Sequence, residues 1–239
     1  MKKTKVVLAL ACAVLLAGAS IMGTLAYLTS TTAEVKNTFT IGENVVITLD
    51  EAKTDEYGNP LKVDGKNEDG SDKFVVTANK AEAKRVMGNE YKLMPGHSYL
   101  KDPTVHVQGN DCYVFVVVKN GIESILADTT INNQIENGCW NEVIAGTGET
   151  LGNISTGEKL YIYKKTDEVT GATKSVAKKN EDLVVFGNFV VKDTIVNGDL
   201  ATYADANVTI KAYAVQTVDF EDMTPIQIWN ATFGVVSGS

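Results

Sequence analysis

The sequence predicts an all-β protein, a β-sandwich or barrel whose strands are joined by turns and small helices. Three observations lead to this prediction. Apolar and polar residues alternate with period two from Val45 to Asp50, as in a half-buried strand. The stretch Cys112–Lys119 is apolar on both faces, which is typical of a central strand covered on each side. Many other short apolar runs are separated by Gly, Asn and Asp, the residues that favour turns.

The start of the chain has the pattern of a secretory signal peptide. Three lysines within the first five positions precede an uncharged apolar core, Val6–Met22. Thr24 and Ala26 place small residues three and one before the expected cut, so Tyr27 becomes the first mature residue. Residues 1–26 are therefore expected to be removed on export, and the protein touches a membrane only through this segment before cleavage.

Two other interpretations of this segment remain. The apolar core has about the length of a short membrane-spanning helix, so an uncleaved anchor is the first alternative. A lipid attached to Cys12 is the second, but Ala9–Ala11 lacks the leucine usual three positions before a lipidated cysteine.

A polar, strand-prone arm, Tyr27–Phe39, follows the expected cut. Ala33, Val35, Asn37 and Phe39 alternate along it. Cleavage turns this arm into a free N-terminus just before the first clear strand, so the arm is able to pair with an open sheet edge. A lone strand is unstable without a sheet. The alternatives are that the arm is a disordered tail or that it pairs with its own sheet.

The rest of the chain, residues 40–239, is expected to form one β domain, because about 210 mature residues suit a single large domain. A polar excursion at about 52–80, rich in Asp, Gly and Asn, predicts one or two exposed hairpins. Further strands are predicted at 73–78, 103–107, 159–165, 183–191 and 207–219. Short helices are predicted at 81–87, 122–137 and 224–233, the last opening at Pro225.

Cys112 and Cys139 are the cysteines of the mature chain. In an exported protein two cysteines are able to form one disulfide. The alternative is two buried thiols, because Cys112 lies in an apolar strand where a free cysteine packs well. Sequence leaves both open.

Composition and motifs favour a protein without enzymatic chemistry. The net charge of −8 becomes −11 once the three lysines of the signal segment are removed, which argues against nucleic-acid or anionic-lipid binding through bulk charge. The two histidines, His97 and His106, are nine positions apart and no HExxH zinc motif is present. The sequence also lacks a GxSxG nucleophile motif and a glycine-rich phosphate loop. We therefore expect no catalytic residues, no metal and no cofactor.

Four stretches together resemble the TasA/camelysin family of Gram-positive bacteria. TLAYLTSTTAEVKNTFTIGENVVITL is similar to the family's cleavage junction, arm and first strand. YKLMPGHSYLKDPTVHVQGNDCYVFVVV is similar to its Leu-x-Pro-Gly turn and core strand. ENGCWNEV and VTIKAYAVQTVDF resemble a helix end before a Trp and the last strand. The stretches occur in the family's order over most of the mature chain. The 52–80 excursion is of a type that varies in the family, and no acidic tail or sortase signal follows Trp229, so covalent wall attachment is not indicated.

The resemblance implies a jelly-roll-like antiparallel β-sandwich that forms extracellular fibres of the biofilm matrix. A SipW-type signal peptidase would release the arm, which would fill an open sheet edge of the next subunit in a head-to-tail homopolymer, with related matrix subunits as further partners. Two other functions remain as alternatives. One is a camelysin-like surface metalloprotease, and the other is a non-polymerising adhesin or envelope protein. Lysine–Asp/Asn side-chain cross-links occur in bacterial surface domains, but the sequence does not locate one here.

Overall fold

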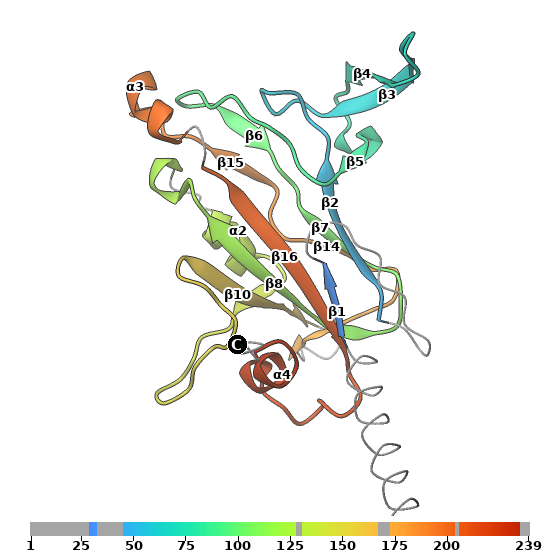
Figure 1. Cartoon of the computed structure of the whole chain (residues 1–239), viewed down its shortest axis with the longest axis vertical. Coiled ribbons are helices and arrows are strands. Elements are labelled where there is room, and N and C mark those ends of the chain that lie inside the picture. Colours follow the sequence, from blue (N-terminus) through green and yellow to red (C-terminus); the bar gives the residue numbers. More distant parts are fainter. Residues whose placement is uncertain (1–28, 33–44, 128–130, 167–172, 204–205, 235–239) are drawn as a thin grey trace, which may run out of the picture.

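The computed structural model describes residues 29–32, 45–127, 131–166, 173–203 and 206–234 of the 239-residue chain (Figure 1). These residues form several antiparallel sheets with few helices, which confirms the all-β class. The predicted cleavage residues and most of the predicted arm residues lie outside the described part: Thr24, Ala26, Tyr27, Ala33, Val35, Asn37 and Phe39.

The larger sheet is built around its two longest strands. Among the described residues it runs in the order β1–β16–β8–β10–β9, with β13 also joined to β8. β8 and β16 pair antiparallel along their whole length, from Val208 opposite Asn120 to Gln216 opposite Cys112. The strands are β1 (Thr29–Thr32), β8 (Cys112–Asn120), β9 (Trp140–Glu142), β10 (Glu158–Tyr163), β13 (Val176–Ala177) and β16 (Val208–Gln216).

The smaller sheet shares a core with the larger one. Its order is β14–β7–β2–β5. Ile47 and Val105 of this sheet belong to the same buried cluster as Val116 and Ala212 of the larger sheet, so apolar side chains from both sheets meet between them. Its strands are β2 (Ile47–Ala52), β5 (Arg85–Val86), β7 (Thr104–Val107) and β14 (Asp182–Val184).

β8 is covered on both faces, as its sequence predicts. Val114, Val116 and Val118 point into the core between the two sheets. Phe115 and Val117, which alternate with them, belong to a second cluster on the outer face. All five side chains are buried, because successive side chains of a strand point to opposite faces and both faces are packed.

The second cluster is closed by helix α4 (Pro225–Thr232), which lies against the outer face of the larger sheet (Figure 1). Thr224 and Gln227 form a capping box at its start, and Pro225 occupies the first turn, as predicted. Trp229 is fully buried, and its ring lies 5.0 Å from the Tyr213 ring and 5.6 Å from the Phe115 ring. The helix therefore anchors the C-terminal part of the described chain on β8 and β16.

Short elements fill the connections. The polar excursion forms the hairpin β3–β4, which projects from the body (Figure 1). The other short strands pair as β6 with β15 and β11 with β12. The bounds are β3 (Leu61–Lys66), β4 (Asp72–Val76), β6 (Ser98–Leu100), β11 (Lys165–Thr166), β12 (Thr173–Lys174), β15 (Asn188–Val190), η1 (Lys80–Glu82), η2 (Glu123–Ile125), α2 (Ile131–Asn137), α3 (Asn197–Leu200) and η3 (Ala201–Tyr203).

Two predicted elements differ from the structure. The helix predicted at 81–87 is only the 3₁₀ turn η1, followed by β5, because Arg85 and Val86 pair with the end of β2. The single strand predicted at 183–191 is divided into β14 and β15, which belong to different sheets. Gly187 lies at the division, where its N–H donates to the Gln134 side chain instead of a neighbouring strand.

Candidate functional site: an incomplete sheet edge

The strand β1 lies at the edge of the larger sheet, beside β16 (Figure 1). Its four residues pair antiparallel with the second half of β16, from Thr29 opposite Val215 to Thr32 opposite Ala212. Part of the predicted arm thus pairs with its own sheet in the single chain. This arrangement also identifies β16 as the strand with which the arm residues 29–32 hydrogen-bond.

The first half of β16 keeps an open edge in the described structure. Val208–Lys211 pair with β8 on one side, and no strand among the described residues pairs with them on the other. Unpaired N–H and C=O groups on such an edge are free to accept an added strand. The β16 edge is therefore half occupied and half open.

A groove lies next to this open half. A cavity of about 580 Å³ separates the first residues of β16 from β2. A second cavity of about 560 Å³ lies next to it, because the two share Asn89, Lys101 and Val208. The first is lined by Leu49, Asp50, Glu51, Met87, Gly88, Asn89, Lys101, Pro103, Val208, Thr209 and Ile210.

β2 forms the opposite wall of the groove, and it too has an open stretch of edge. Ile47–Asp50 pair with β7, whereas β5 pairs with β2 only at Glu51 and Ala52. Within the part of the chain that the structure describes, Ile47–Asp50 have no strand on the side away from β7. Two sheet edges therefore flank one groove, and Leu49 and Ile210 supply apolar side chains to it.

A charged network ties the β2 wall to its neighbours. Asp50 Oδ1 lies 2.6 Å from Arg85 Nε and 2.9 Å from His106 Nε2, and His106 Nδ1 lies 2.6 Å from Asp182 Oδ1. Arg85 also reaches Asp102 at 3.2 Å. Burial acts to lower the pKa of His106, but the hydrogen bonds and charges of Asp50 and Asp182 outweigh it and raise the pKa. When it is protonated, His106 on β7 binds carboxylates of both β2 and β14.

A buried ion pair lies deeper in the same wall. Lys101 Nζ lies 2.6 Å from Glu51 Oε2, and the two side chains are 10% and 4% exposed. Asn89 donates from Nδ2 to the other Glu51 oxygen at 2.8 Å. Removing either charge of such a pair leaves the other uncompensated in the interior, so the pair ties the segments around Glu51, Asn89 and Lys101 together.

The two predicted cysteines are both free thiols in the structure. Cys112 begins β8 and is buried, Cys139 directly precedes β9 and is exposed, and β10 lies between these strands. Adjacent strands lie about 4.8 Å apart, so β8 and β9 are separated by more than the roughly 7 Å that a disulfide spans between Cα atoms. The structure therefore contradicts the disulfide and supports the two-thiol alternative, except that Cys139 is not buried. Burial raises the pKa of the Cys112 thiol to about 12.

The two histidines belong to different places in the fold. His97 Nε2 lies 2.8 Å from the Tyr57 carbonyl, and its ring packs on Tyr99. His106 lies between two carboxylates on the smaller sheet. Among the described residues, no group of three or more His, Cys, Asp or Glu side chains is placed to hold a metal ion.

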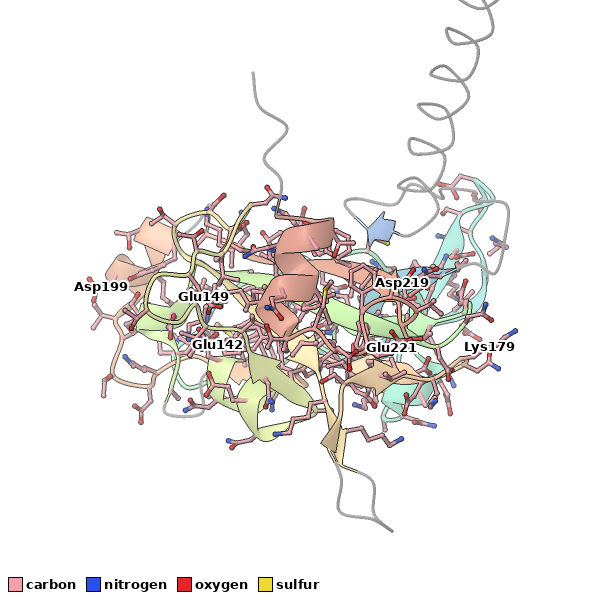
Figure 2. The ribbon with its side chains drawn as sticks, turned by 90° about the horizontal axis from the view of Figure 1, so that it is seen from below. Glu142, Glu149, Lys179, Asp199, Asp219 and Glu221 are labelled. Carbon is pink, nitrogen blue, oxygen red and sulfur yellow. The ribbon has the colours of Figure 1, made fainter. Side chains whose placement is uncertain are left out.

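Acidic side chains are spread around the face that carries α4. Figure 2 shows Glu142 and Glu149 on one side of this helix and Asp219 and Glu221 on the other, whereas Asp199 belongs to α3, which lies at the far end of the molecule in Figure 1. Some acidic side chains of the chain are held by lysines, as Lys159 holds Glu142 at 2.9 Å.

Sequence reasoning missed the cluster of Glu51, Asn89 and Lys101. The three residues lie 12 to 50 positions apart and occur in no motif, because antiparallel pairing of distant segments brings them together. The one available signal was the charged pair Lys101-Asp102 just before an apolar strand.

The chain matches no model of a known protein family, and no curated protein sequence or solved structure is significantly similar to it. Within the described residues, no helix combines the length and the apolar character needed to cross a membrane.

Proposed function

We propose that this chain is a secreted structural subunit of extracellular fibres of the biofilm matrix. In this proposal the mature domain is a jelly-roll-like β-sandwich, and the arm Tyr27–Phe39 of one subunit completes the β16 edge of the next. One observation carries the proposal: residues 29–32 of the arm pair with β16, while no strand among the described residues pairs with the adjoining half of that edge beside the groove. The sequence resemblance to the TasA/camelysin family points the same way.

Exchange of β1 between subunits changes the free energy of its backbone hydrogen bonds by close to zero. An arm residue that leaves its own β16 and binds the β16 of a neighbour exchanges equivalent hydrogen bonds, so the net free energy depends on what else the arm contacts. The open stretch Val208–Lys211 and the groove beside it offer sites for further arm residues. Binding of further arm residues at these sites would favour exchange between subunits over pairing of the arm with its own β16.

The geometry of such an exchange leads to a filament. The arm and the β16 edge are different surfaces, so contact between subunits is heterologous and head to tail, and a rotation that does not close gives an open fibre. In this proposal the signal peptide prevents premature assembly, because an arm still joined to the membrane segment is not free to pair with the β16 edge of another subunit. The alternative of a zinc protease gains nothing from His97 and His106, which have separate partners.

Deleting residues 27–35 from the mature chain tests this function. The deletion removes β1 and leaves intact both buried clusters that the structure describes, whose first member is Ile47, so we expect a folded, soluble monomer that does not elongate. The measurements are circular dichroism for the fold and negative-stain microscopy for filaments, beside the mature chain that begins at Tyr27. Filaments of normal length from the truncated chain contradict the proposal. Unfolding of the truncated chain would show that the arm belongs only to its own sheet.

A further inference from the structure

Three reactive side chains converge in the wall of the groove. The Glu51 carboxylate lies between the Lys101 amine and the Asn89 carboxamide. One carboxylate oxygen accepts from Lys101 Nζ at 2.6 Å, and the other accepts from Asn89 Nδ2 at 2.8 Å. Because both nitrogens bind one carboxylate group, the amine and the carboxamide are held next to each other.

The orientation of the Asn89 carboxamide follows from its partners. Nδ2 donates to Glu51 and also to the Ala52 carbonyl at 2.8 Å, and only the nitrogen is able to donate to two acceptors. Oδ1 accepts from the Thr54 backbone N–H at 2.8 Å. The carbonyl carbon is thus polarised by a fixed N–H donor, which is the arrangement that stabilises negative charge developing on an oxygen.

The surroundings keep the amine away from bulk water. Counted over the whole residue, backbone included, Lys101 is 8% exposed and Glu51 is 3% exposed. The Tyr91 ring lies 5.9 Å from Lys101 Nζ, and the Tyr91 hydroxyl donates to the Leu100 carbonyl. In such a site the electrostatic contacts that Glu51 makes with Lys101 and Asn89 are stronger than in water, and the shared carboxylate holds the two reacting groups near each other.

We propose that Lys101 and Asn89 form an intramolecular isopeptide bond, with Glu51 as the proton carrier. Glu51 accepts a proton from the Lys101 ammonium, and the neutral amine attacks Cγ of Asn89. The tetrahedral intermediate carries its negative charge on Oδ1, held by the Thr54 N–H. The new C–N bond remains, the bond from Cγ to Nδ2 breaks, and protons move from the attacking nitrogen and from Glu51 to the departing nitrogen.

The reaction balances without a cofactor or an oxidant. One lysine ammonium and one carboxamide become one secondary amide and one ammonium ion, and Glu51 ends as the carboxylate with which it began. Asn89 is the acceptor because its carboxamide carbon is polarised by Thr54 and its nitrogen already binds the proton carrier. Glu51 remains free, since the amide forms to the neighbouring side chain.

The product joins two segments that flank the end of β2. Asn89 lies after β5 and Lys101 directly after β6, and both line the two cavities of the groove. The cross-link therefore fastens the chain on both sides of the groove wall by a bond that neither denaturant nor reductant breaks. It uses none of the residues that pair in the β1–β16 edge.

Intact-mass measurement of the purified, denatured full chain tests the bond. We expect the chain to weigh less than its sequence by the mass of one ammonia. Trypsin cuts after lysine only when the side chain is free, so the cross-linked protein yields residues 86–92 joined to residues 93–119. An unmodified mass in folded protein after long incubation, with residues 93–101 released as a free peptide, overturns the proposal. Loss of water with a bond to Glu51 overturns it as well.

Variants then assign the roles. Glu51→Gln, Asn89→Ala and Lys101→Arg are each expected to abolish the mass loss and the joined peptide. Lys62→Arg is the matched control, because Lys62 pairs with Glu82 at 2.9 Å on the exposed hairpin and should leave the cross-link at its wild-type fraction. A joined peptide that persists in Lys101→Arg contradicts the assignment. If a variant does not fold, the wild-type mass alone decides the question.

Discussion

At the scale of single residues, ion pairs and charged hydrogen bonds hold the β2 wall of the groove to the neighbouring strands. Asp50 binds both Arg85 and His106, and Asp182 binds the other nitrogen of His106. Asp102 completes the network by accepting from the Ala52 N–H at 2.7 Å as well as from Arg85. The network connects all four strands of the smaller sheet. The protonation of His106 therefore affects the stability of β2 within this sheet.

His106 makes this network sensitive to pH. Its pKa is raised in the folded chain above the ordinary histidine value of about 6.5. The stabilisation from its protonated form is therefore complete below about pH 6.5 and is lost as the pH rises through the folded pKa. We expect His106→Gln to lower the free energy of unfolding more at pH 5.5 than at pH 8.5, measured by chemical denaturation.

Gln108→Ala serves as the control for this comparison. Gln108 donates from Nε2 to the Thr48 hydroxyl at 3.3 Å, and neither side chain titrates, so the variant should keep the pH dependence of the wild type. An equal loss of stability from His106→Gln at both pH values would show that His106 contributes only uncharged contacts.

At the scale of elements, α4 combines a local sequence signal, the capping box of Thr224 and Gln227, with the burial of Trp229 against the larger sheet. Thr224→Ala removes the acceptor for the Gln227 N–H, so we expect a loss of about 1 kcal/mol in the free energy of unfolding. Trp229→Ala removes a fully buried ring and should cost about 3–5 kcal/mol. Met223→Ala, at a side chain that is 42% exposed, should change stability by less than about 0.5 kcal/mol. Urea denaturation of the three variants tests this order, and equal losses from Trp229→Ala and Met223→Ala contradict it.

The elements also show what a sequence alone is able to reveal. β8 and α4 follow from their own residues, because a continuous apolar run and an N-terminal cap are local signals. The break of the 183–191 run into β14 and β15 is not local. It depends on β6 and β7, which pair with the two parts in different sheets. The short strand β5 likewise exists because β2 lies beside Arg85 and Val86.

The candidate site was predictable only in part. The cleavage pattern and the alternation predict the arm but do not predict that residues 29–32 pair with β16, because pairing between distant segments leaves no mark on either sequence. The cluster of Glu51, Asn89 and Lys101 has the same origin. The disulfide was expected from the export pattern together with two cysteines, and the structure contradicts it because β10 lies between their strands.

At the scale of the whole molecule, the described parts of the two main sheets leave open stretches of edge on β16 and β2, with a groove between them where a strand is able to add. The larger sheet is packed on both faces, so the molecule offers its partners edges and not faces at this place. The edge begins beside the segment that is expected to become the N-terminus on cleavage. The proposed assembly through this edge therefore requires that the arm leave its own β16.

A disulfide across the β1–β16 register measures this claim most directly. Ser30 lies opposite Ala214, so cysteines at both positions can lock the arm to its own sheet. We would place Ser30→Cys and Ala214→Cys in a mature chain that also carries Cys139→Ser, with Cys139→Ser alone as the control. Negative-stain microscopy should show monomers for the oxidised chain and filaments for the same chain after reduction. Filaments of equal length and number in both states would contradict the account.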